Sequence, residues 1–153
     1  NTMAYKQQLP SMLRLLNTPI IGRLGLTMMS ARWHALEAYR YAFSDDSKIP
    51  SDGVEHSAKI IEDPNAKYAY IQTVSQLVPD DINIMTKQYN RIKIPTLIIW
   101  GEDDISIRVY NAYRLHNILP NSRLKVFENI GHMPQEEAPK KVIHEIKTFM
   151  KNS

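Results

Sequence analysis

Apolar residues recur at helical spacing through the first ninety residues, and turn and capping residues interrupt them. Asp63-Pro64 places a capping residue before a proline at the first helical position, and apolar residues follow at intervals of three and four. Thr18-Pro19 repeats this arrangement, Ser51 begins a similar segment, and Asp80 begins a last short one. This pattern predicts four or five helices and no strand over residues 1–90.

The pattern changes in the last third of the chain. Residues 94–100 are β-branched and continuously apolar, which is typical of a strand buried on both faces. Helical spacing follows over residues 107–119, apolar and polar residues alternate over 123–128, and residues 138–150 form an amphipathic pattern. The predicted order is therefore strand, helix, strand, helix, which is typical of an α/β protein with a parallel sheet.

Two strands are too few for such a sheet. Parallel sheets carry helices on both faces, and a lone pair of strands leaves main-chain donors and acceptors without partners along an edge. We therefore expect the chain to be the C-terminal half of a larger α/β fold, or to form a homo-oligomer through an unpaired sheet edge. A boundary near residue 90 separates a helical region, residues 1–90, from a sheet region, residues 91–153.

Composition narrows the class of protein. With 43% hydrophobic and 23% charged residues, the sequence is typical of a soluble globular domain, and its longest strongly apolar run, residues 97–100, is too short to span a membrane. The absence of cysteine excludes disulfides and a cysteine nucleophile, and favours a cytoplasmic setting. The net charge of +3 comes from basic residues scattered over residues 91–153, so we expect no nucleic-acid partner.

Two ionisable residues follow the two predicted strands. Asp103 and Asp104 come just after the first strand, and His132 comes shortly after the second. Because the carboxyl ends of parallel strands meet at one edge of a sheet, an aspartate and His132 are expected to lie close together. A carboxylate that accepts a hydrogen bond from one imidazole nitrogen leaves the other nitrogen to act as a base. Spacing alone does not choose between the two aspartates.

Three segments together resemble the end of an α/β-hydrolase. They are Ile-Pro-Thr-Leu-Ile-Ile-Trp-Gly-Glu-Asp-Asp at residues 94–104, Pro-Asn-Ser at 120–122, and Gly-His-Met-Pro-Gln-Glu-Glu-Ala-Pro at 131–139. In that family, Trp-Gly-x-x-Asp supplies the acid of a catalytic triad, Gly-His supplies the base, and Glu-x-Pro opens the last helix. The resemblance implies that Asp104 is the acid and His132 the base, and that residues 1–90 form the cap, or lid, over the substrate pocket.

The nucleophile of that family is missing from this sequence. It sits in a Gly-x-Ser-x-Gly elbow upstream of the cap, and none of the five glycines here frames a serine or an aspartate. This agrees with the shortage of strands. We therefore expect a C-terminal hydrolase fragment that is inactive by itself, whose parent protein supplies the nucleophile.

Within the family, the sequence looks most like carboxylester hydrolases and carbon-carbon bond hydrolases. The resemblance implies cleavage of an ester or similar acyl bond in a small apolar substrate, with no cofactor or metal. Dehalogenases, epoxide hydrolases and carbon-carbon bond hydrolases share the aspartate and histidine, so they remain alternatives, and the nucleophile could be serine or aspartate. A non-catalytic module that binds a small ligand or a partner is the alternative outside the enzymes.

Apolar side chains are candidates for the wall of the substrate pocket. Met28, Met29 and Trp33 in the predicted cap, and Met133 beside the expected base, are our candidate substrate contacts. Ordinary helix packing explains the same spacing in the cap, so both interpretations stay open. Glu136 and Glu137 are interpreted as acidic residues favoured at the start of a helix.

Overall fold

The computed structural model describes residues 4–6, 14, 28–76 and 78–152. The chain forms two compact units, one made of Asn1–Lys6, Tyr41–Lys48 and Asp80–Ser153, the other of Gln7–Arg40 and Ile49–Pro79. The expected boundary near residue 90, between a cap and a sheet region, stays a prediction.

Helices dominate the described residues before position 96, and no strand occurs among them. The helices expected to begin at Ser51 and after Asp63 are confirmed, whereas the one expected at Thr18-Pro19 lies outside the described residues. The elements are α3 (Ala31–Ala42), a 3-10 turn (Asp46–Lys48), α4 (Ser51–Glu62), α5 (Pro64–Ser75), α6 (Ile82–Thr86) and a second 3-10 turn (Tyr89–Arg91). In the second unit, Ala35 of α3 packs against Val54 and Ala58 of α4.

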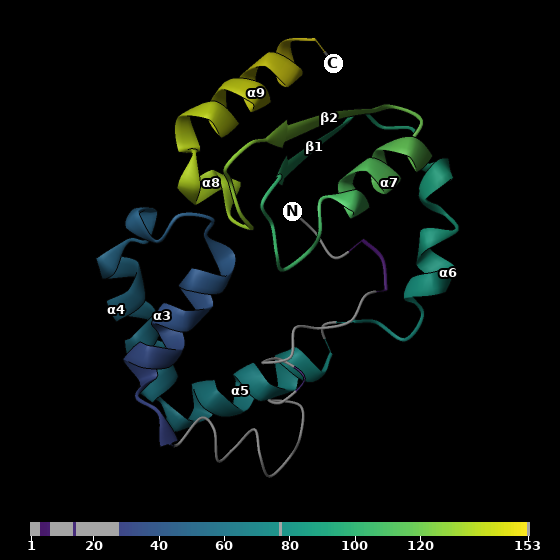
Figure 1. Ribbon diagram of the computed structural model, residues 1–153. Helices are drawn as coiled ribbons and strands as arrows, with labels where there is room; N and C mark the ends of the chain where they lie inside the picture. The colour runs from purple at the N-terminus through teal and green to yellow at the C-terminus, as the bar shows by residue number, and fades with distance from the viewer. Residues whose placement is uncertain (1–3, 7–13, 15–27, 77, 153) are drawn as a thin grey trace. The chain divides into compact units, whose positions relative to one another are not determined.

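The expected strand, helix, strand, helix order is confirmed in the first unit (Figure 1). The elements in this order are β1 (Thr96–Gly101), α7 (Tyr110–Ile118), β2 (Ser122–Phe127), the short α8 (Pro134–Glu137) and α9 (Pro139–Lys151). The two strands are parallel, and their register runs from Thr96 opposite Ser122 to Gly101 opposite Phe127. Both strands therefore end at the same edge of the sheet.

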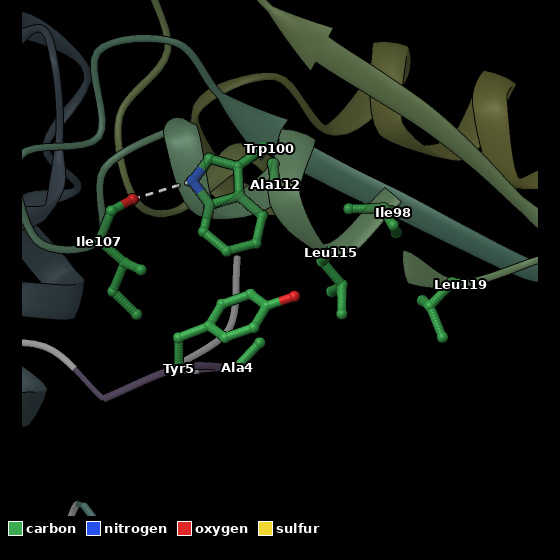
Figure 2. Packing of buried hydrophobic residues seen from close by; sticks show 8 residues of the cluster. All are labelled: Ala4, Tyr5, Ile98, Trp100, Ile107, Ala112, Leu115 and Leu119. Carbon is green, nitrogen blue, oxygen red and sulfur yellow. Dashed lines mark hydrogen bonds between the residues drawn. The ribbon is translucent and has the colours of Figure 1, made fainter. Parts of the chain in front are cut away.

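Helices α7 and α9 cover opposite faces of this sheet. Ile98 and Trp100 are buried against Ala112 and Leu115 of α7, and Tyr5 closes the same cluster from below (Figure 2). Ile99, whose side chain alternates to the other face, packs against the cluster that contains Val142 of α9. The face toward α7 is buried, whereas Leu97 and Ile99 on the face toward α9 are half-buried, so the burial on both faces that the apolar sequence predicts is met in part.

The edge of β1 away from β2 is open along the described part of the chain. β1 pairs only with β2 in the described sheet, and a groove of about 480 Å³ runs along its free side. Residues from both helical layers, Leu115 of α7 and Ile146 and Phe149 of α9, line this groove together with β1. None of the described helices is long and apolar enough to cross a lipid bilayer.

Candidate active site

Two loops leave the carboxyl ends of the strands and run side by side. The acid loop, residues 101–107, follows β1, and the base loop, residues 128–133, follows β2. The Glu102 N–H donates to the Phe127 carbonyl oxygen over 2.9 Å, and the Asp103 N–H donates to the Ile130 carbonyl oxygen over 3.0 Å. These hydrogen bonds continue the pairing of the strands beyond the sheet, so the loops stay in contact.

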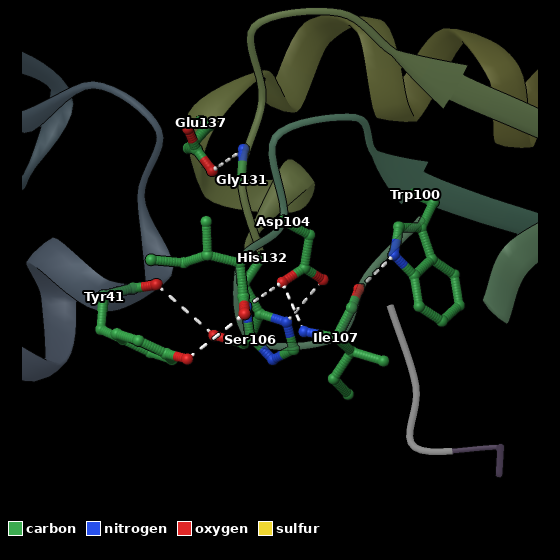
Figure 3. Close-up of polar contacts among 9 residues, drawn as sticks. Tyr41, Trp100, Asp104, Ser106, Ile107, Gly131, His132 and Glu137 are labelled. Atoms are coloured by element: carbon green, nitrogen blue, oxygen red, sulfur yellow. Dashed lines mark hydrogen bonds and ion pairs between the residues drawn. The ribbon is translucent and has the colours of Figure 1, made fainter. Parts of the chain in front are cut away.

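Asp104 lies buried between the two loops, with 1% of its surface exposed. Its Oδ1 accepts the main-chain N–H groups of Ser106 and Ile107, both over 2.8 Å. Its Oδ2 lies 2.9 Å from His132 Nδ1 (Figure 3). These three hydrogen-bond contacts fix the direction of the carboxylate.

His132 combines a fixed backbone with an accessible ring. Its main-chain N–H donates to the Ala42 carbonyl oxygen over 2.6 Å, and 32% of its side chain is exposed. A hydrogen bond from Nδ1–H to Asp104 selects the tautomer in which Nε2 carries a lone pair. In that tautomer the ring can accept a proton at Nε2.

The acid loop is closed by the side chain of Trp100. The fully buried indole Nε1–H donates to the Ile107 carbonyl oxygen over 2.9 Å, while the Ile107 N–H donates to Asp104. Tyr41, from the first unit, adds a hydrogen bond from its hydroxyl to the Ile105 carbonyl oxygen over 3.2 Å. Burial raises the pKa of Tyr41, the charge of Arg108 opposes this shift and that of Asp104 adds to it.

Both motif glycines are required by the close approach of the two loops. A Cβ atom on Gly101 would lie 2.0 Å from the Gly131 carbonyl oxygen and 2.3 Å from that of Ile130. A Cβ on Gly131 would lie 2.5 Å from the Ala42 carbonyl oxygen. Because these neighbours are main-chain atoms, no side-chain rotation can relieve the overlap.

Glu137 holds the base loop, a role that the sequence interpretation missed. Its buried carboxylate accepts the Gly131 N–H at Oε1 over 2.7 Å and the Ser44 N–H at Oε2 over 2.9 Å. Glu137 lies in the first turn of the four-residue α8, as the sequence interpretation has it, but that interpretation did not foresee the hydrogen bond to the base loop. The Glu-x-Pro motif was the signal that could have singled it out.

The structure brings two of the expected site residues together, Asp104 and His132. Asp103 is exposed and makes its described contact through its backbone, so Asp104 is the aspartate that meets the ring. Met133, adjacent to His132, is half-buried. Met28, Met29 and Trp33 belong to the second unit, where they are 75%, 43% and 39% exposed. Their contact with substrate remains a prediction.

No set of three histidine, aspartate and glutamate side chains is placed to bind a metal ion within the part of the chain that the structure describes. His116 is engaged with Ser122, whose Oγ lies 2.9 Å from its Nδ1. His56 and His144 are exposed on helices α4 and α9. The pair of Asp104 and His132 is therefore the candidate catalytic site.

Comparison with known proteins places this geometry in a family. Residues 33–139 match the alpha/beta hydrolase fold family. Lipase 3 of Moraxella sp. is 28% identical over 85 residues, which cover 56% of this chain and 27% of that lipase.

Solved structures extend the likeness over almost the whole chain. An alpha/beta hydrolase fold protein from Burkholderia ambifaria superposes with a TM-score of 0.78 at 21% identity, covering 95% of this chain and 53% of that protein. The 2-hydroxy-6-oxo-6-phenylhexa-2,4-dienoate hydrolase of Rhodococcus sp. strain RHA1 gives 0.72 at 17% identity, covering 97% and 52%. The chain spans about half the length of these two structures and about a quarter of the lipase.

Proposed function

Because this chain belongs to the α/β-hydrolase fold family, we propose that Asp104 and His132 are the acid and base of a Ser-His-Asp triad in a carboxylic ester hydrolase. The observation that carries the proposal is the 2.9 Å contact between Asp104 Oδ2 and His132 Nδ1, made by a buried carboxylate and an imidazole that stays partly open to solvent. Matching of the family over residues 33–139 supports the assignment, because that span contains both residues.

In the proposed reaction the serine oxygen bonds to the ester carbonyl carbon, and its proton passes to His132 Nε2. The ester C–O bond then breaks, and Nε2 returns the proton to the departing alcohol. Water attacks the acyl-serine by the same two proton transfers, which releases the acid and regenerates the serine. Throughout, Asp104 holds the ring in one orientation and stabilises its protonated form.

We place the serine outside this chain. The open edge of β1 supports this, because the groove beside it is lined by both helical layers and has the form expected where further strands continue a sheet. The share of the solved relatives that the chain covers, about half, also supports it. The 153-residue chain is therefore expected not to hydrolyse esters by itself.

The substrate is proposed to be a small apolar ester. The likeness to a lipase supports this class, and so does the apolar side chain of Met133 beside the proposed base. The exposed side chains of Met28, Met29 and Trp33 are proposed as further contacts.

The test is hydrolysis of nitrophenyl esters by the full-length protein and by its His132→Ala variant. Loss of the base should lower kcat by about 10⁴-fold or more. His144→Ala, at an exposed position on α9, is the matched control and should retain activity. Near-normal turnover by His132→Ala would refute the proposal. Cleavage of haloalkanes or epoxides instead of esters would point to an aspartate nucleophile and change the reaction class.

A further inference from the structure

We propose that Glu137 is a positioning residue for His132, holding the base loop through a buried carboxylate that also binds Ser44. This inference deepens the proposed function, because it concerns how the proposed base is kept in place. It starts from a buried ionisable side chain that the triad itself does not use: Glu137 is 8% exposed, and its described hydrogen bonds go to Gly131 and Ser44 (Figure 3).

The carboxylate joins two segments that are far apart in the sequence. Oε1 accepts the Gly131 N–H over 2.7 Å, and Oε2 accepts the Ser44 N–H over 2.9 Å. Ser44 Oγ lies 2.8 Å from Oε2 and 2.8 Å from the Asn129 carbonyl oxygen. Each carboxylate oxygen is therefore occupied by a main-chain donor. The Ser44 hydroxyl, with one proton to donate, lies within hydrogen-bond distance of both the same carboxylate and the start of the base loop.

The position of His132 depends on this contact because its backbone is held from outside at consecutive residues. The Ile130 carbonyl oxygen accepts from Asp103, the Gly131 N–H donates to Glu137, and the His132 N–H donates to Ala42. Glu137 is the one side chain in this series, since the other two partners are main-chain groups. It is therefore the member that a substitution can remove.

The substitution Glu137→Gln tests the positioning role, because glutamine has nearly the same shape as glutamate. Whichever way the amide is turned, its NH₂ group faces a main-chain N–H, either that of Gly131 or that of Ser44, and one hydrogen bond becomes a contact between two donors. Displacement of the base loop by a fraction of an ångström should lower kcat about 10- to 100-fold. KM should change less than kcat, because Met133 is the one proposed substrate contact that lies in the displaced loop.

The experiment measures kcat and KM of the full-length protein with Glu137→Gln, Ser44→Ala and, as matched control, Glu136→Gln. Glu136 lies on the same short helix, but it is exposed. Ser44→Ala keeps the main-chain donor and removes the hydroxyl, so a smaller fall in kcat of about threefold is expected. The control should behave as the wild type.

A second readout separates positioning from general stability. Nitrogen-15 NMR of the His132 ring reports its tautomer without any substrate. The wild type should show one tautomer with the proton on Nδ1, and Glu137→Gln should show a mixture or exchange broadening. A merely structural role would lower the melting temperature and leave these signals unchanged.

The inference is overturned if Glu137→Gln matches Glu136→Gln in kcat and leaves the ring signals unaltered. If Glu137→Gln does not fold, Ser44→Ala decides, and unchanged kcat and ring signals in that variant overturn the inference. A wild-type protein that cleaves no ester would refute the proposed function alone, because the ring signals test the positioning role independently.

Discussion

The acid loop and the base loop meet at one edge of the sheet, but they are held in different ways. The acid loop is held largely from within: Asp104 accepts hydrogen bonds from residues two and three positions ahead, and Trp100 closes the turn onto Ile107. The base loop is held from outside, by Ala42, Glu137 and the backbone of Asp103. A short sequence motif can therefore specify the first loop, whereas the second depends on segments distant along the chain.

Residues 41–44 form hydrogen bonds that support both loops. The Ala42 carbonyl oxygen and both donors of Ser44 serve the base loop, directly or through Glu137, while the Tyr41 hydroxyl reaches the acid loop. This short segment therefore supports both the loop that carries Asp104 and the loop that carries His132. Substitutions at the junction of the loops should affect both, and substitutions inside one loop should affect that loop first.

The largest effect is expected from Gly101→Ala, which forces the two loops apart. The new methyl group would overlap the main-chain oxygens of Ile130 and Gly131, so we expect a loss of about 3 kcal/mol or more in the free energy of unfolding. Chemical denaturation followed by circular dichroism measures it.

Gly53→Ala in α4 is the control for that substitution. Its Cβ would lie 2.7 Å from the Tyr39 hydroxyl oxygen and 3.0 Å from Pro50 Cγ, which are both side-chain atoms and not main-chain oxygens. We expect a change within about 1 kcal/mol, since alanine is also the better helix former. Equal losses at the two glycines would contradict the close approach of the loops.

A smaller effect is expected from Trp100→Phe, which disturbs the acid loop and the core between β1 and α7. The substitution removes the donor to the buried Ile107 carbonyl oxygen and leaves a small cavity, so a loss of about 2 kcal/mol in unfolding free energy is expected. Thermal unfolding of Trp33→Phe, a partly exposed position in α3, provides the comparison and should change by about 0.5 kcal/mol. Equal melting temperatures for the two variants would show that the indole does not hold the loop.

The smallest effect concerns Tyr41, in the segment of residues 41–44, and appears at alkaline pH. Burial raises the pKa of Tyr41 above its ordinary value of 10.0, so the folded state holds this proton more tightly than the unfolded chain. The stabilisation is complete below the unfolded pKa and is lost as pH rises through the folded one.

Tyr41→Phe should therefore reduce the alkaline fall in stability without abolishing it, because burial also raises the pKa of Tyr5 and Tyr89. Unfolding free energies from pH 8 upward measure this slope. An identical slope in wild type and variant would contradict the raised pKa of Tyr41 in the folded state.

The order of the elements and the meeting of Asp104 with His132 were predictable from the sequence. Parallel strands that end in register place the residues after them at one edge, so a carboxylate and an imidazole 28 positions apart become neighbours. Strand pattern alone could not choose Asp104 over Asp103. The difference lies in burial, which depends on how the turn after Gly101 closes.

The supports of the base loop were not predictable by the same reasoning. Ser44 and Glu137 lie 93 positions apart, and neither sits in a periodic pattern that links them. The Ala42 carbonyl oxygen belongs to the main chain, and main-chain partners leave no trace in residue type. Glu137 looked like an ordinary acidic residue at a helix start because its local sequence fits that role equally well.

The central claim, that Asp104 orients His132 for catalysis, is tested most directly by comparing Asp104→Asn with Asp103→Asn in ester hydrolysis by the full-length protein. The two substitutions are chemically identical and adjacent, but only Asp104 bonds to the ring. We predict a fall in kcat of about 10⁴-fold for Asp104→Asn and a change within about twofold for Asp103→Asn, whose described contact is made by its backbone. Similar activities of the two variants would contradict the account.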